Sequence, residues 1–140
     1  MFSAYLFAGI AMLFWGIAPI FGKLGLGNTQ PLVALTIRSL IISMILLITV
    51  TVSGQWENIL GVTSKNATYI AIEGICAALL GQFAYYYALK YGEVSQISPL
   101  VAAFPLIALL LGIIVLGEKI TLYKVAASFL IVGGVVLMKY

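Results

Sequence analysis

Five apolar stretches follow one another along the chain, and short polar segments separate them. They cover residues 2–21, 32–52, 67–89, 96–116 and 122–138. Each is close to the ~20 residues that an α-helix needs to cross about 30 Å of hydrocarbon. A membrane-spanning barrel would alternate polar and apolar residues in segments of about 10 residues, and these stretches do not alternate. Because lipid offers no partner to a free backbone group, the pattern predicts one all-α integral membrane domain over residues 1–140, with five transmembrane helices.

The connecting segments carry most of the charges. The longest, residues 53–66, has room for a short interfacial helix around Trp56 but for no further domain. Five spans put the termini on opposite sides of the membrane. The N-terminal side holds the terminal amine and three lysines, namely Lys65, Lys119 and Lys124. The other side holds Lys23, Lys90, Lys139 and Arg38. The bias that normally orients a membrane protein is absent, which predicts insertion in both directions, or orientation by a weaker cue or a partner.

Composition supports a lipid environment for the whole chain. The chain is 64% hydrophobic and 8% charged, whereas a soluble domain has about 45–50% apolar and about 25% charged residues. There is no histidine and one cysteine, which excludes Ser-His-Asp catalysis, Cys-His catalysis and an ordinary zinc site within one chain. We therefore expect a protein that is not an enzyme and that uses no cofactor or metal. The net charge of +3 is small and scattered, so nucleic acid is not an expected partner.

The third stretch has two different faces. At 100° per residue, its small residues gather on one side and its large apolar residues on the other. The small residues are Gly74, Ala77, Ala78, Gly81, Ala84 and Ala88. Small residues let helices approach closely in lipid, so this face is expected to pack on protein. Glu73 lies at one edge of the face, Tyr85 at the other, and Gln82 and Tyr86 lie further round.

Polar residues and prolines mark the other spans. Pro105 cannot donate to the carbonyl of Val101, which leaves that carbonyl open to a neighbour, a water or a ligand. Thr36, Ser39 and Ser43 form a stripe, but hydroxyls commonly bond backward along their own helix, so packing is the simpler interpretation. The aromatic residues Trp15, Tyr85, Tyr86 and Tyr87 are compatible with cation or flat-ring binding and equally with an interfacial belt.

Arg38 and Glu73 lie roughly two turns inside apolar stretches, where ionisable residues are rare and usually functional. They enter from opposite sides, each about 10 Å deep, which leaves a vertical gap of about 10 Å within one chain. In an antiparallel dimer the level of Arg38 in one chain coincides with that of Glu73 in the other. The two then pair across the dimer or face a shared polar cavity. The alternative is that Arg38 snorkels to its near interface and Glu73 is a shallow, hydrated carboxylate.

Several short motifs occur in a fairly specific order. They are Ala88-Leu89-Lys90-Tyr91-Gly92, Ser98-Pro99-Leu100, Pro105-Leu106 and Leu116-Gly117-Glu118-Lys119, together with Trp15-Gly16, Arg38 and Gly133-Gly134. In these the chain resembles the EamA-like family of the drug/metabolite transporter superfamily. The resemblance implies ten helices made of two inverted five-helix halves, of which this chain resembles one. It implies a substrate site near the midplane. We expect its lining to include Trp15, Arg38, Glu73, Gln82, Tyr86, Ser98, Pro99 and Pro105. Packing between halves is expected from Gly74, Ala77, Ala78, Gly81, Gly133 and Gly134.

The resemblance also implies a function. It predicts a multi-pass transporter of small metabolites or drugs in a prokaryotic plasma or inner membrane, working as an antiparallel homodimer by alternating access. The related small multidrug resistance proteins carry a carboxylate in their first span, and this chain has no ionisable residue there before Lys23. If transport is coupled to protons, Glu73 is the only carboxylate well inside a span. Two alternatives remain: a half-transporter that pairs with a different short chain, and a non-transporting accessory or scaffold subunit.

Overall fold

The structure is a computed structural model that describes residues 2–137, so the predicted end of the last span at Met138, and Lys139, lie outside the described residues. The chain divides into two compact units, one up to Tyr91 and one from Gly92. The all-α prediction is confirmed: four helical stretches are long and apolar enough to cross a membrane, and a fifth apolar helix is shorter. Each unit is described separately below.

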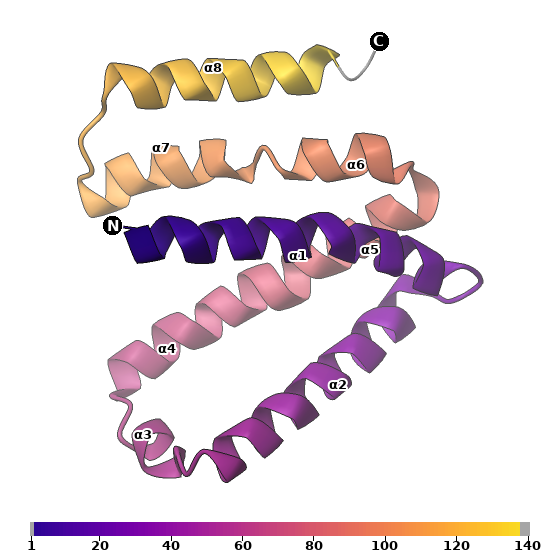
Figure 1. Cartoon of the computed structure of the whole chain (residues 1–140), viewed down its shortest axis with the longest axis vertical. Coiled ribbons are helices and arrows are strands. Elements are labelled where there is room, and N and C mark those ends of the chain that lie inside the picture. The colour runs from indigo at the N-terminus through magenta and orange to yellow at the C-terminus, as the bar shows by residue number, and fades with distance from the viewer. Residues whose placement is uncertain (1, 138–140) are drawn as a thin grey trace. The chain divides into compact units, whose positions relative to one another are not determined.

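Unit 1 contains three of the long helical stretches (Figure 1). They are α1 (Phe2–Leu26), α2 (Pro31–Val52), and a composite third span made of α4 (Ser64–Glu73), η1 (Gly74–Gly81) and α5 (Gln82–Tyr91). Pro31 begins α2, where its missing N–H leaves no bond unmade. The short α3 (Trp56–Leu60) lies between α2 and α4, in the segment where the sequence left room for a short helix around Trp56. The Thr36 hydroxyl donates to the carbonyl of Leu32 at 2.8 Å, as expected for a hydroxyl that bonds along its own helix.

The third span is not a uniform α-helix. Its central eight residues, η1, form a π-helix, in which each N–H bonds to the carbonyl five residues earlier. At its end the N–H of Gln82 donates to the carbonyl of Ala77. The division of faces derived at 100° per residue is therefore wrong through residues 74–81, because a π-turn is wider than an α-turn. The small residues of this segment are distributed around the helix differently from the prediction.

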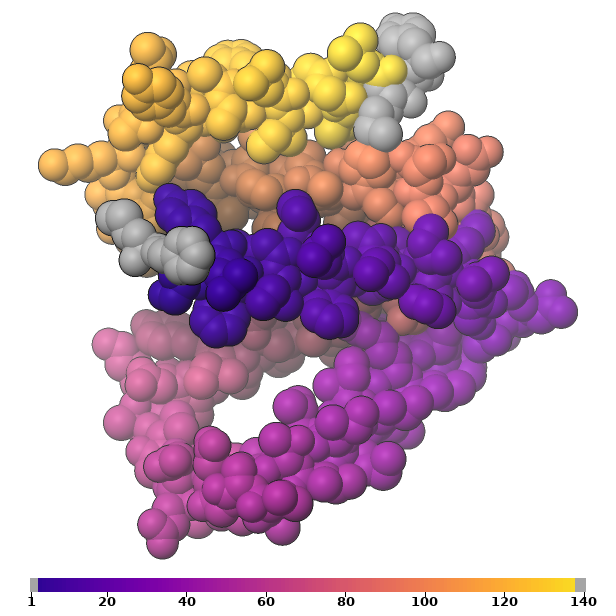
Figure 2. Space-filling model, viewed as in Figure 1, coloured from indigo at the N-terminus to yellow at the C-terminus, as the bar shows by residue number. Residues whose placement is uncertain are grey.

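The core of unit 1 lies at one end. Its buried apolar residues are Leu26, Leu35, Tyr86 and Leu89. They come from the end of α1, the start of α2 and the second half of α5, and α5 packs against both other helices. No residue of α3, α4 or η1 is buried. From the packed end, α2 and α4 diverge toward α3 (Figure 1), and the space-filling view shows an opening between them (Figure 2).

Unit 2 contains α6 (Val94–Val101), α7 (Phe104–Leu116) and α8 (Leu122–Leu137). α6 and α7 together make the fourth span, Val94–Leu116, which is interrupted at Ala102 and Ala103. There the N–H of Ala103 bonds to the carbonyl of Leu100 at 3.2 Å, a tighter turn than the α-helix makes. The interruption is followed by Phe104 and Pro105, the first two residues of α7.

Candidate functional site

Two spans, one in each unit, depart from regular α-helix inside an apolar stretch, and most of the predicted site residues lie beside these irregularities. In lipid, such backbone is tolerated where it is surrounded by protein or lines a water-filled cavity. The π-helix η1 and the interruption between α6 and α7 are therefore the candidate functional segments.

Three of the residues predicted to line a substrate site lie beside the interruption in the fourth span. Ser98 and Pro99 lie in α6, Pro105 lies in the first turn of α7, and both Ser98 and Pro99 are half-buried. The carbonyl of Ser98 accepts from the N–H of Ala102 at 2.8 Å, which closes α6. Pro105 has no N–H to continue the helical ladder across the turn. The sequence predicted the missing hydrogen bond but not that the span divides into two helices.

In unit 1, Glu73 and Gln82 flank η1. Glu73 is the last residue of α4 and is exposed, whereas Gln82 is the first residue of α5 and is half-buried. Tyr86, one turn further along α5, is 8% exposed and belongs to the core of the unit. Trp15 projects from α1 with 68% of its surface exposed.

Arg38 is half-buried in α2. Within residues 2–137, neither Arg38 nor Glu73 forms an ion pair. Their pairing across a dimer stays a prediction.

A pair of lysines joins the ends of α1 and α5, and we call this arrangement the lysine clasp. Lys23, in the last turn of α1, donates from Nζ to the carbonyls of Leu89 at 2.6 Å and Lys90 at 3.4 Å. Lys90, in the last turn of α5, donates from Nζ to the carbonyls of Leu26 at 3.1 Å, Gly27 at 2.5 Å and Thr29 at 3.0 Å. Lys23 thus donates to terminal carbonyls of α5, and Lys90 donates to two carbonyls of the link after α1 and to that of Leu26, which also accepts from the N–H of Thr29 at 2.7 Å. Each ammonium lies at the negative end of the other helix's dipole.

From the sequence, both clasp lysines were expected to be charges of the connecting segments. The available signal was their position: each stands in the last turn of a helix, where cations satisfy terminal carbonyls. Each lysine bonds to carbonyls at the end of the other helix because α1 and α5 end side by side, and this proximity is a property of the fold that the sequence does not show.

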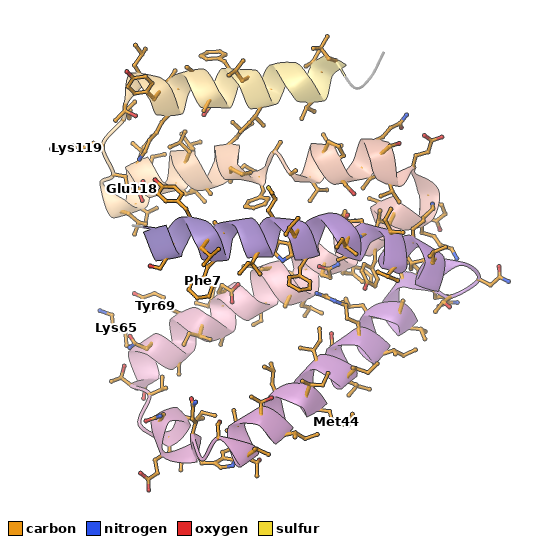
Figure 3. All side chains as sticks on the ribbon, viewed as in Figure 1. Phe7, Met44, Lys65, Tyr69, Glu118 and Lys119 are labelled. Carbon is orange, nitrogen blue, oxygen red and sulfur yellow. The ribbon has the colours of Figure 1, made fainter. Side chains whose placement is uncertain are left out.

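The link between α7 and α8 is closed by a glutamate that folds back (Figure 3). Gly117 has φ 67°, the left-handed conformation that ends α7, and the N–H of Glu118 then bonds to the carbonyl of Gly112 at 3.1 Å. The Glu118 carboxylate lies over Gly112, where an added Cβ would come within 3.4 Å of its carboxyl carbon. Lys124, in the first turn of α8, pairs with the same carboxylate at 3.0 Å. The Gly117-Glu118 motif therefore has a structural role in joining two helices.

An open groove of about 190 Å³ runs between α7 and α8. It is lined by Pro105, Leu106, Leu109, Lys124, Ala127, Ser128 and Ile131. Its lining is almost entirely apolar, and the Ser128 hydroxyl is already bonded to the carbonyl of Lys124 at 2.9 Å. The groove has little with which to orient a polar ligand.

The small residues predicted to pack between halves remain uncovered. A Cβ added at Gly74, Gly133 or Gly134 would meet nothing within 4 Å. Ala77, Ala78 and Gly81 are exposed along η1. Packing of these residues against a second half stays a prediction.

Comparison with known proteins gives the family. Residues 2–140 match the EamA-like transporter family. An uncharacterized transporter of Sinorhizobium sp. is 24% identical over 129 residues, which are 92% of this chain and 91% of the relative. An uncharacterized protein of Methanocaldococcus jannaschii is 28% identical over 141 residues, covering 99% of this chain and 97% of the relative.

A third relative differs in length. An uncharacterized transporter of Archaeoglobus fulgidus is 38% identical over 66 residues, which are 47% of this chain but 24% of the relative. That relative is therefore roughly twice as long as the 140 residues here. No solved structure matches the chain. Membership of a transporter family implies a non-enzymatic role, and the match over residues 2–140 shows that this chain belongs to the EamA-like transporter family.

Proposed function

We propose that the chain is one half of a transporter that moves small metabolites or drugs across a prokaryotic plasma or inner membrane. Two copies, inserted in opposite directions, would form the complete transporter and work by alternating access. The observation that carries this proposal is the length of the relatives. Two of them match this chain over nearly their whole length, and a third is roughly twice as long. A long chain can supply two halves, whereas a short one needs a second molecule.

The irregular spans support a site between two halves. Transporters built from inverted repeats place their substrates near the midplane, at discontinuous helices where the two repeats meet. This chain has one interrupted span and one π-helical span, and the small residues Gly74, Gly133 and Gly134 are uncovered. A second copy would cover these residues and complete the lining of the proposed site. The absence of a positive-charge bias in the sequence favours insertion in both directions.

We also propose that Glu73 exchanges the coupling proton and that Arg38 of the opposite copy lies at its level. Glu73 is the only glutamate well inside a span: Glu57 belongs to the short α3, Glu93 precedes α6, and Glu118 lies in the α7–α8 link. A carboxylate at this depth is costly unless it has a function.

The dimer is tested by fusing a topology reporter to the C-terminus. We expect reporter activity on both sides of the membrane in comparable amounts. A single fixed orientation would refute the antiparallel homodimer and would favour pairing with a different short chain.

Coupling is tested in reconstituted vesicles by a screen of metabolites and drugs with an imposed pH gradient. We expect Glu73→Gln to lose gradient-driven uptake while Glu118→Gln, a matched change in the α7–α8 link, retains it. Intact uptake by Glu73→Gln would remove the coupling role. If alanine at Trp15, Glu73, Gln82 and Tyr86 alters only assembly, an accessory or scaffold subunit replaces the transporter.

A further inference from the structure

The third span is held at one end only. Its second half, α5, is fixed by the five hydrogen bonds of the lysine clasp and by the burial of Tyr86 and Leu89. Its first half, α4, makes few contacts with any helix other than the adjoining η1, and neither segment buries a residue. The π-helix thus separates a fixed half from an unsupported half.

The π-geometry of η1 depends locally on glycine. A Cβ added at Gly81 would lie 3.0 Å from the carbonyl oxygen of Cys76, five residues earlier, which is closer than a Cβ normally approaches. At the other end of η1, a Cβ added at Gly74 would meet nothing within 4 Å. An alanine therefore fits the π-helix at residue 74 and crowds it at residue 81.

Conversion between π- and α-geometry has a defined mechanical effect. In a π-helix an N–H bonds to the carbonyl five residues earlier, and in an α-helix to the carbonyl four residues earlier. A change from the first bond to the second shifts one part of the helix by one residue relative to the other. One position of an α-helix corresponds to a rotation of about 100° and a translation of about 1.5 Å. Because α5 is fixed, this movement would be expressed in α4, across the opening that separates it from α2 (Figure 2).

We propose that η1 is a hinge that interconverts between π- and α-geometry and moves α4 against the fixed end formed by α1, α2 and α5. As the moving part of alternating access, the hinge rests on the proposed transport function. As a conformational equilibrium of unit 1, it can be measured without any substrate. Glu73 is the last residue of α4, so the hinge movement carries its carboxylate with it.

Spin-label distances across the opening test the hinge. In a Cys76→Ala background, labels are placed at Met44 on α2 and Tyr69 on α4, both exposed (Figure 3). A control pair uses Met44 and Tyr91, which is 81% exposed at the end of α5. The protein is reconstituted in liposomes with a tenfold excess of unlabelled chain, so that distances within one chain dominate. We expect two populated distances for the α2–α4 pair and one for the α2–α5 pair.

The matched glycine variants give the decisive comparison. Gly81→Ala is expected to reduce the α2–α4 pair to one distance, whereas Gly74→Ala keeps both, although the two substitutions are chemically identical. A single α2–α4 distance in the parent protein overturns the hinge, as does an equal effect of the two variants. Should Gly81→Ala fail to fold, amide exchange in the parent decides: the hinge requires faster exchange over residues 74–81 than in α2, and equal protection overturns it.

The outcomes separate the hinge from the transport function. Two distances with no uptake of any screened compound would refute transport and leave the hinge standing. Uptake together with a single α2–α4 distance would refute the hinge and leave transport standing.

Discussion

The lysine clasp should contribute measurably to the stability of unit 1, and Lys90→Met is the change that isolates it. Methionine keeps an unbranched apolar stem and removes the ammonium. The carbonyl oxygens of Gly27 and Thr29, in the link that follows α1, then lose the Lys90 donor, and that of Leu26 keeps only the N–H of Thr29. The packing of the Lys90 stem is largely retained, so the measured loss reports the hydrogen bonds.

Two reference values bound the expected decrease in the free energy of unfolding. Hydrogen bonds to charged groups in soluble proteins contribute about 1.5–3 kcal/mol each, which would give at least about 4.5 kcal/mol for three. Bonds between helices measured within a membrane protein average about 0.6 kcal/mol, which gives about 2 kcal/mol. Lys90 is half-buried at the end of a span, so water can replace part of the loss. We therefore expect the lower value, about 2 kcal/mol for Lys90→Met, and about 1 kcal/mol for Lys23→Met, which loses one short and one long bond.

The assay is reversible unfolding in mixed detergent micelles, followed by circular dichroism. The matched control is Lys65→Met, because Lys65 is exposed in the first turn of α4 and its side chain makes no hydrogen bond or ion pair within residues 2–137. Its substitution is expected to change the free energy of unfolding by less than about 0.5 kcal/mol. If Lys90→Met and Lys65→Met unfold alike, the clasp has no energetic role and the fixed end of unit 1 must be explained by packing alone.

Two further predictions concern the α7–α8 link. Gly117→Ala should destabilise unit 2 by about 1–2 kcal/mol in the same unfolding assay, because φ 67° is a left-handed conformation that alanine adopts at a cost. The control is Gly9→Ala, where an added Cβ meets nothing within 4 Å, and it should be neutral or stabilising. A neutral Gly117→Ala would contradict the role assigned to Gly117. A double-mutant cycle of Glu118→Gln and Lys124→Met should give a coupling below about 1 kcal/mol that weakens with salt, because the two side chains are 49% and 39% exposed, and a larger, salt-insensitive coupling would show that the pair is shielded from water.

The sequence predicted an all-α chain of apolar helices because one strong physical constraint applies to all of them. In hydrocarbon the backbone must bond to itself, so the apolar stretches become helices whatever their side chains. The length of the segment between the second and third spans left room for a short helix around Trp56, and α3 lies there. The sequence also identified Pro105 as a residue that breaks the helical ladder, since proline lacks the donor in every context.

The sequence could not predict η1 or the lysine clasp. The segment from Gly74 to Gly81 has glycine at both ends but no residue that excludes the ordinary α-helix, so its sequence does not distinguish a π-helix from an α-helix. The partners of Lys23 and Lys90 are backbone carbonyls, which every residue possesses and which no sequence pattern distinguishes. For the same reason, the depth of Arg38 and Glu73 could be estimated but their partners could not.

In the proposed antiparallel dimer, the clasp and the hinge would give each chain a rigid end and a movable end. Unit 1 has a fixed end, where Lys23 and Lys90 join α1 and α5, and a diverging end beside α3. In an antiparallel pair the fixed end of one copy lies at the same membrane face as the diverging end of the other. Each face would then have one rigid wall and one movable wall. Such an arrangement would let either face open while the other stays closed, which is the requirement of alternating access, and it would need only one kind of chain.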